Sequence, residues 1–400
     1  MRRSYTYLDD AFLCKAILII SNGLTLSGIT VFDEVLLEEF KWSRSELKFR
    51  DFLNLVCAAI ILPFIGALID RYGVKRSILF GLGLLSICYY LYSGIGQLRD
   101  MYLLHIGFAF VVATSGVLAI IIMVSQRVKE KRGLAIGIAV AGTSLGGMII
   151  PQIGTRLLEQ NEWRTGFKYE ALLPIFLLVV VLLLLRDRRN ATKEEASATE
   201  DQEEPSFTFK EALRSPTYWG VGLAGFLSYY AILAIISNLF LYLRSLDFTP
   251  VAAGNALSLL FGIILGAKFL SGFLTDYFSQ FKLFRIQFAI MTVGAVLLAL
   301  GDASLIIPAL VVIGLGWGGM YTLFNYIIIE AFGLKSAGKI GGTISTLESI
   351  GGGLGIWLTG LLYDQYGSYS QGFWVVAAFV ATSFIISFFI RPTTKTTVTE

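Results

Sequence analysis

Two charged side chains lie well inside long apolar stretches of this sequence. Lys268 stands within the run 252–274, and Glu348 within the run 339–363. A charge in hydrocarbon costs roughly 2.5–3.5 kcal/mol on insertion scales, so it indicates a functional site. The lysine could bind an anion, form a structural ion pair, or extend its amine to the inner membrane surface. The glutamate could carry a proton or simply neutralise the lysine.

Other kinds of site chemistry have little support. The sequence contains one histidine, His105, and three cysteines without metal-ligand spacing, so neither a metal site nor a disulfide framework is expected. We interpret His105 as a polar residue near a helix end, with a proton-linked role as the alternative. The glycine-rich stretches carry no nucleotide-binding motif. We therefore expect that the protein binds no cofactor, has no catalytic residue and is not an enzyme.

The elements that must position Lys268 and Glu348 are membrane spans. The chain is 55% hydrophobic and 15% charged, whereas soluble proteins carry about 25% charged residues. A net charge of +3, spread along the chain, excludes a nucleic-acid-binding face. A spanning helix needs ~20 mostly apolar residues. Such runs occur at 12–36, 50–69, 77–97, 102–126, 134–157, 169–186, 217–243, 252–274, 284–302, 304–329, 339–363 and 372–390.

The fold class is therefore an all-α polytopic membrane protein. Segments on the side of the two termini hold more than twice as many Lys and Arg residues as those on the other side, which places both termini in the cytoplasm. We predict one six-helix bundle at 1–186 and another at 216–400. The intervening 187–215 forms a charged cytoplasmic linker that ends in a short interfacial helix at 207–213.

The two halves match at an offset of 206 residues. Gly66 and Asp70 correspond to Gly272 and Asp276, and the pair Trp42 and Ser43 corresponds to Phe248 and Thr249, each pair just before an even-numbered span. Three further glycines correspond in the same way, as do Gly166 and Phe167 with Gly372 and Phe373. Parallel six-span repeats are typical of transporters with a site near the membrane midplane.

The segment 66–76 between the second and third spans reads GALIDRYGVKR. It resembles the major facilitator superfamily signature GxLxDRxGxKR. We expect Gly66 to allow close approach of a helix, Gly73 to permit a tight turn, and the charged residues to gate the cytoplasmic side. The predicted gating motif comprises Gly66, Asp70, Arg71, Gly73, Lys75 and Arg76, with Gly272 and Asp276 as a weaker second copy.

Segments 132–147, 163–164, 40–45 and 360–369 are similar to the monocarboxylate and oxalate–formate branch of that superfamily. The resemblance implies that the position of Lys268, four residues before Gly272, holds the cation that pairs with a substrate carboxylate. That branch has arginine there, and this departure removes the bidentate geometry. By resemblance, spans one, four, seven and ten line the cavity. The candidate substrate-binding residues are Lys268, Asn22, Thr114, Tyr229, Tyr321 and Asn325, and the candidates for proton coupling are Glu348 and Lys268.

Four charged residues lie at the outer ends of the first two spans. We interpret Asp33, Glu34, Arg50 and Asp51 as solvated loop residues, with an outer gate as the alternative. The charge-free spans six and twelve are expected to face lipid.

We predict a secondary transporter that moves a small organic anion, a monocarboxylate with a proton, by alternating access. One alternative is an exporter of an uncharged or cationic amphiphile. Another is a membrane sensor that binds a ligand on the same fold without translocating it. The expected partners are the anion, protons and the lipid bilayer, with a monomer in a bacterial inner membrane.

Overall fold

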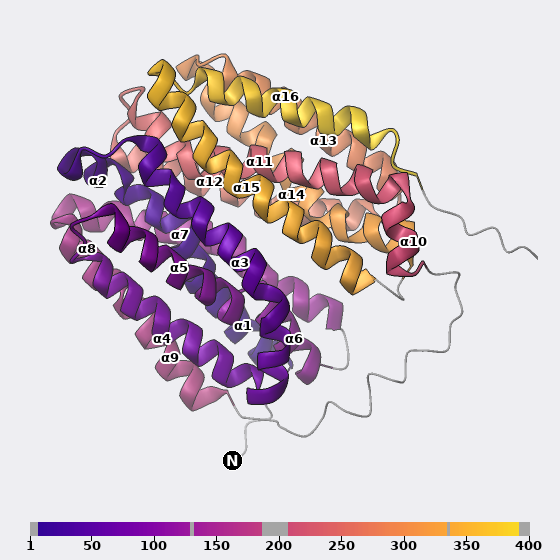
Figure 1. Cartoon of the computed structure of the whole chain (residues 1–400), viewed down its shortest axis with the longest axis horizontal. Coiled ribbons are helices and arrows are strands. Elements are labelled where there is room, and N and C mark those ends of the chain that lie inside the picture. Colours follow the sequence, from indigo (N-terminus) through magenta and orange to yellow (C-terminus); the bar gives the residue numbers. More distant parts are fainter. Residues whose placement is uncertain (1–6, 129–131, 186–206, 334–336, 392–400) are drawn as a thin grey trace, which may run out of the picture. The chain divides into compact units, whose positions relative to one another are not determined.

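The structure, a computed structural model, describes residues 7–128, 132–185, 207–333 and 337–391. Every element of these residues is helical (Figure 1). The predicted linker falls largely outside the described residues, since its section 186–206 is not part of them. Its final short helix is present as α10 (Phe209–Arg214), where a helix was expected at 207–213.

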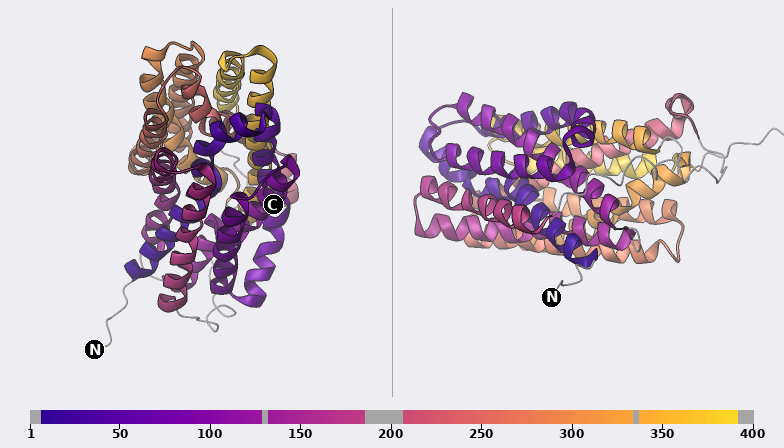
Figure 2. Two further views of the ribbon diagram at one scale, coloured as in Figure 1. Left: turned by 90° about the vertical axis from the view of Figure 1, so that its left-hand side faces the viewer. Right: turned by 90° about the horizontal axis from the view of Figure 1, so that it is seen from below.

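The chain divides into two compact units. The first contains Met1–Ala196 and Leu239–Phe261, and the second contains Ser197–Asn238 and Gly262–Glu400. Within each unit the long helices run side by side (Figure 2). The helices up to the linker are α1 (Tyr7–Asn22), η1 (Gly23–Gly28), η2 (Ile29–Phe32), α2 (Asp33–Phe40), α3 (Arg44–Tyr72), α4 (Val74–Tyr92), α5 (Leu98–Ser115), α6 (Val117–Arg127), α7 (Arg132–Gln160), α8 (Trp163–Glu170) and α9 (Leu172–Leu184).

Two long helices contribute to both units. The last turns of α11 (Pro216–Arg244) and the first turns of α12 (Pro250–Leu274) belong to the first unit, and their remaining turns belong to the second. The other helices of the second unit, besides α10, are α13 (Gln280–Ala299), α14 (Ala303–Phe332), α15 (Ala337–Tyr366) and α16 (Ser370–Ser387).

Eleven helical segments of the described residues are long and apolar enough to cross a membrane. They coincide with eleven of the twelve predicted spans. The remaining predicted span, 339–363, is α15, a continuous helix of 30 residues. It is long enough to cross a bilayer, but glycine, serine and threonine take the place of many aliphatic residues in it.

The first span is not a regular helix. After α1, the backbone winds as a π-helical segment over Gly23–Gly28 and a 3₁₀ segment over Ile29–Phe32 before α2 begins. The hydroxyl of Tyr89 in α4 donates to the carbonyl of Leu24 at 2.7 Å, which satisfies one backbone group of this irregular stretch. π-helical and 3₁₀ stretches within a helix often mark functional positions.

The fourth span is also interrupted, and a hydrogen bond joins residues that lie next to the two interruptions. Gly116 adopts an extended conformation between α5 and α6. A Cβ there would collide with the carbonyl of Val112, so the break requires glycine. The hydroxyl of Ser21 at the end of α1 donates to the carbonyl of Ser115 at 3.1 Å. Irregular backbone at membrane depth is tolerated only where it is buried in protein or lines a cavity.

Helix caps explain where two spans begin. The Ser43 hydroxyl accepts from the Glu46 amide at 3.2 Å, and the Glu46 carboxylate accepts from the Ser43 amide at 2.8 Å, so α3 begins at Arg44. In the corresponding place of the repeat, the Thr249 hydroxyl accepts from the Ala252 amide at 3.2 Å, just before Pro250 starts α12. Ser43 and Thr249, which correspond in the repeat, therefore both cap the start of a span.

Glycines let the fifth membrane span of each half approach the first span of the same half. In α7, a Cβ on Gly146 would lie 2.6 Å from the carbonyl oxygen of Ile19 in α1. In α15, a Cβ on Gly355 would lie 2.8 Å from the carbonyl carbon of Tyr230 in α11. Both contacts are with backbone, which cannot move aside as a side-chain tip can.

The predicted lipid-facing spans present apolar side chains to the outside. Leu183 and Phe176 of α9 are among the most exposed hydrophobic residues of the chain, and Trp374 and Ile385 of α16 are also exposed. In water such an apolar face would be unfavourable, and in a bilayer it is the expected surface.

Candidate functional site

Lys268 lies over an aromatic ring. This residue of α12 is half-buried, and its Nζ lies 4.5 Å from the centroid of the Tyr321 ring in α14. An ammonium over an aromatic face gains about 0.5–1 kcal/mol at exposed sites and more where water is excluded. The structure therefore brings together two residues that were predicted to bind substrate, and it holds the cation next to an aromatic surface.

Tyr321 begins an aromatic cluster that extends away from the lysine. The ring of Trp317 lies 6.3 Å from that of Tyr321 and 4.9 Å from that of Tyr229 in α11, and Phe324 lies 6.4 Å from Tyr229. Tyr229 and Tyr321 were predicted from the sequence, whereas Trp317 and Phe324 were not. The signal was present, because positions 317, 321 and 324 share one face of a helix.

Glu348 approaches the same region from α15. The residue is only 7% exposed. It packs against Gly225 of α11, where a Cβ would lie 3.1 Å from Cγ and 3.2 Å from Oε1 of the glutamate. Gly225 precedes Tyr229 by one helical turn, so Glu348 and the aromatic cluster adjoin the same face of α11.

The repeat shows why there is room for a glutamate. Gly142 of α7 occupies the position that corresponds to Glu348, and a Cβ there would meet the backbone of Lys15 in α1. In the second half the glycine is instead on the other helix, at Gly225. Glu348 therefore has space beside Gly225, whereas the corresponding position of the first half lies against backbone and holds a glycine.

The remaining predicted substrate residues fall in different places. Asn22 is half-buried at the end of α1, directly before the π-helical segment. Thr114 is buried beside the break in the fourth span, but its hydroxyl donates to the Phe110 carbonyl at 2.6 Å and packs against Gly81. These contacts favour a packing role for Thr114. The side chain of Asn325 lies outside the described part of the structure.

The predicted gating motif forms a turn between α3 and α4. Gly73 has φ 88°, a left-handed value that favours glycine, as the expected tight turn requires. Lys75 donates to backbone carbonyls at the end of α9, one of them that of Leu182 at 3.3 Å. Arg71 lies over the neighbouring Tyr72 ring at 5.3 Å, and Arg76 is exposed.

Three parts of the motif prediction are not confirmed by the described residues. The described residues place no atom within 4 Å of a Cβ at Gly66 or Gly272, so the expected close approach of a helix is not observed at either glycine. Asp276 is exposed. The side chain of Asp70 lies outside the described part of the structure.

The interpretation of the outer charges as solvated is wrong for three of the four residues. Asp33 and Arg50 are fully buried and Asp51 is nearly so, whereas Glu34 is 24% exposed in its side chain and pairs with Arg244 at 2.6 Å. The physical reason is that α3 begins at Arg44, so Arg50 and Asp51 lie within the helix and pair with other charges there. His105, interpreted as a polar residue near a helix end, lies within α5 (Leu98–Ser115) and is fully buried.

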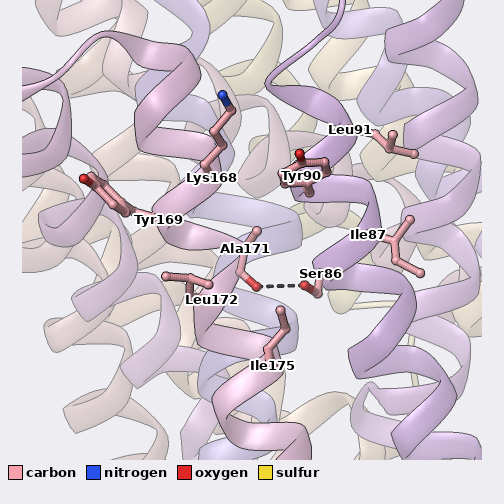
Figure 3. A pocket seen from close by; sticks show the side chains of 9 residues that line it. All are labelled: Ser86, Ile87, Tyr90, Leu91, Lys168, Tyr169, Ala171, Leu172 and Ile175. Carbon is pink, nitrogen blue, oxygen red and sulfur yellow. Dashed lines mark hydrogen bonds between the residues drawn. The ribbon is translucent and has the colours of Figure 1, made fainter.

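An open groove on the first unit does not resemble the candidate site. Its volume is about 490 Å³, and it lies between α4 and the helices α8 and α9 (Figure 3). The Ser86 hydroxyl donates to the Ala171 carbonyl at 2.8 Å across its floor. Its other polar lining side chains, Tyr90, Lys168 and Tyr169, lie towards one end (Figure 3). The rest is apolar and continuous with the lipid-facing surface of α9, as expected of a surface in contact with lipid.

Comparisons with known proteins identify the family of the chain. Residues 13–356 match the family model described as Major Facilitator Superfamily. The oxalate:formate antiporter of Oxalobacter formigenes is 24% identical over 86% of this chain and 83% of its own length. Monocarboxylate transporter 13 of Bos taurus is 26% identical over 80% and 74%. The class H tetracycline resistance protein of Pasteurella multocida is 27% identical over 82% of both.

A solved structure shows the same fold. It is the crystal structure of a bacterial homologue of the human lysosomal transporter Spinster in an inward-facing, occupied conformation. It superposes with a TM-score of 0.74 at 14% identity and covers 96% of each chain. The twelve predicted spans, the 66–76 motif and these matches agree: the chain is a multi-pass membrane transporter that belongs to the Major Facilitator Superfamily.

Proposed function

We propose that this transporter moves a small organic anion, specifically a monocarboxylate together with a proton. The observation that carries the proposal is Lys268, a cation inside a membrane span that lies beside the aromatic cluster of Tyr321, Trp317 and Tyr229. A carboxylate at the lysine would gain a charge-assisted hydrogen bond, worth about 1.5–3 kcal/mol. The flat aromatic surface would accept the apolar remainder of a small acid.

Glu348 is proposed to carry the proton. Its carboxyl group lies in a nearly water-free position against Gly225. Burying a charged carboxylate away from water is costly, so in this position the protonated form is favoured. When a substrate anion binds at Lys268 and a proton binds at Glu348, one negative and one positive charge are added, so the total charge of the site is unchanged.

We further propose that the halves 1–186 and 216–400 alternate access, with the cytoplasmic termini and the 66–76 motif on one side. Two contacts in the first unit support a latch on the opposite side. Arg244, at the end of α11, pairs with Glu34, and Gln152 of α7 donates to Asn255 at 2.8 Å and to Ser258 at 3.0 Å in α12. These bonds would have to break for a path to open there. A bacterial inner membrane and a monomer remain predictions.

Uptake of labelled lactate and pyruvate into proteoliposomes tests the proposal. With an inward proton gradient we expect uptake above that of protein-free vesicles, with inhibition by other short carboxylates. Without the gradient, uptake should fall to the level of passive exchange. No uptake by folded protein under either condition would contradict the monocarboxylate assignment.

A second candidate is export of an uncharged or cationic amphiphile. The aromatic cluster and the buried Glu348 would suit such a substrate, and one relative is a tetracycline resistance protein. Expression in a drug-sensitive host distinguishes the two. Raised resistance that is lost in Glu348→Gln but kept in Lys268→Met would favour export, because only the carboxylate attracts a cation.

A further inference from the structure

The first unit contains a cluster of charged side chains that the proposed transport site does not use. Asp33 of α2, Arg50 of α3 and His105 of α5 are fully buried, and Asp51 of α3 is 5% exposed. Lys48 of α3 is fully buried as well. Charged side chains are almost never buried this deeply unless they are paired. The pairing within this cluster therefore determines which of its groups can bind a proton.

One carboxylate of the cluster is saturated and the other is not. Asp33 Oδ2 forms an ion pair with Lys48 Nζ at 2.5 Å, and Asp33 Oδ1 forms one with Arg50 Nη2. Asp51 Oδ1 lies 3.7 Å from Arg50 Nε and 3.6 Å from His105 Nδ1, just beyond hydrogen-bond range. Asp51 Oδ2, Arg50 Nε and His105 Nδ1 are buried without a hydrogen-bond partner among the described residues.

The hydrogen bonds of the Tyr92 hydroxyl favour one tautomer of the imidazole. Arg50 Nη1 donates to the Tyr92 hydroxyl oxygen at 3.0 Å, so the Tyr92 proton is left for another acceptor. His105 Nε2 lies 3.3 Å from the hydroxyl oxygen and can accept that proton. If Nε2 accepts, the neutral ring carries its proton on Nδ1, the nitrogen that faces Asp51.

The charges balance in this form. Lys48 and Arg50 offset Asp33 and Asp51 when His105 is neutral, so one added proton makes the cluster positive by one. Among the described residues, Tyr92 and Tyr89 on α4 and Tyr102 on α5 also interact electrostatically with the cluster, and Glu170 on α8 interacts with Tyr89. Since Asp33 is saturated, the acceptor open to a proton is the Asp51–His105 pair.

We propose that Asp51 and His105 together bind one exchangeable proton, and that this pair is a second proton site of the transporter, in its first unit. The proton binds either at the free Oδ2 of Asp51 or at His105, whose Nδ1–H then faces the carboxylate as part of an imidazolium. Because the two groups interact, the proton belongs to the pair. The gap of 3.6 Å lets a small movement of α5 against α3 change the proton affinity.

The single histidine of the chain makes a direct test possible. Protein labelled with ¹⁵N-histidine and carrying no histidine tag would give NMR signals from His105 alone. At high pH we expect the Nδ1–H tautomer. On acidification between about pH 8 and 5, the range in which histidines commonly titrate, both nitrogen shifts should move with a single midpoint. In Asp51→Asn the midpoint should move by at least about one pH unit, a tenfold change in proton affinity.

Two results would overturn the proposal: signals that do not change over this range, or a midpoint that is the same in Asp51→Asn. Tyr92→Phe is the matched control, since it removes the hydroxyl that faces Nε2 and should redistribute the tautomers while leaving Asp51 in place. If Asp51→Asn does not fold, the wild-type titration alone still decides whether a proton binds. The measurement needs no substrate, so its failure is distinct from a failure of the proposed monocarboxylate transport at Lys268.

Discussion

Asp33 and Glu34 are neighbours in the first turn of α2, and both pair with basic side chains, but they differ in burial. Asp33 is fully buried between Lys48 and Arg50, whereas Glu34 and its partner Arg244 are 24% and 27% exposed in their side chains. The perturbations Asp33→Asn and Glu34→Gln each remove one negative charge and keep the side-chain shape. Comparing these two variants therefore isolates the effect of burial on the contribution of an ion pair to stability.

The expected magnitudes differ severalfold. Removing one partner of a buried pair costs about 3–5 kcal/mol, because the remaining charge is left uncompensated. Asp33→Asn leaves Lys48 and Arg50 with only Asp51 to offset them, so the cluster carries one uncompensated positive charge. Exposed ion pairs contribute about 0.2–1 kcal/mol. Glu34→Gln is therefore expected to cost no more than about 1 kcal/mol.

The free energy of unfolding in mixed detergent micelles measures both variants. If Asp33→Asn does not accumulate, adding Lys48→Met removes the uncompensated positive charge and should recover folded protein. Equal costs for Asp33→Asn and Glu34→Gln, both within about 1 kcal/mol of wild type, would refute the reasoning that burial and pairing hold this cluster together.

Three further variants test other parts of the structure. Gly355→Ala should destabilise the second unit by about 1–3 kcal/mol, because the added Cβ meets backbone of α11. Gly341→Ala in the same helix adds a Cβ to open space and should not destabilise it. Thermal unfolding compares the two variants. Ser43→Ala should lose about 1 kcal/mol from its capping box, measured in the same assay, and no loss would argue against the cap. Tyr321→Phe should keep transport because the ring under Lys268 remains, while Tyr321→Ala should weaken substrate affinity severalfold; equal affinities would contradict the cation–π contact.

The spans and the motif turn could be predicted because they depend on local sequence. Long apolar runs define the helices whatever they pack against, and Gly73 in the 66–76 segment takes the left-handed conformation that its place in the motif predicted. Lys268 and Glu348 could be singled out because a charge in an apolar run is rare. Their contacts with Tyr321 and Gly225 needed the packing of different helices.

The buried ionic cluster could not be predicted for a related reason. Asp33, Arg50 and Asp51 stand at the ends of apolar runs, where solvated loop charges are equally common. Only the early start of α3 at Arg44 and the approach of His105 from α5 reveal that these charges pair away from water. The π-helical stretch after Asn22 was also missed, because its residues are as apolar as those of a regular helix.

The most direct test of the central claim is proton-driven uptake of labelled lactate by wild type, Lys268→Met and Lys268→Arg in proteoliposomes. The matched control is Lys15→Met, since Lys15 is a span lysine that also lies over an aromatic ring, that of Phe12 at 4.3 Å. If Lys268 binds the substrate carboxylate, Lys268→Met should lower the apparent affinity by about tenfold to a hundredfold, Lys268→Arg should retain part of it, and Lys15→Met should resemble wild type. Uptake by Lys268→Met at wild-type affinity would contradict the account.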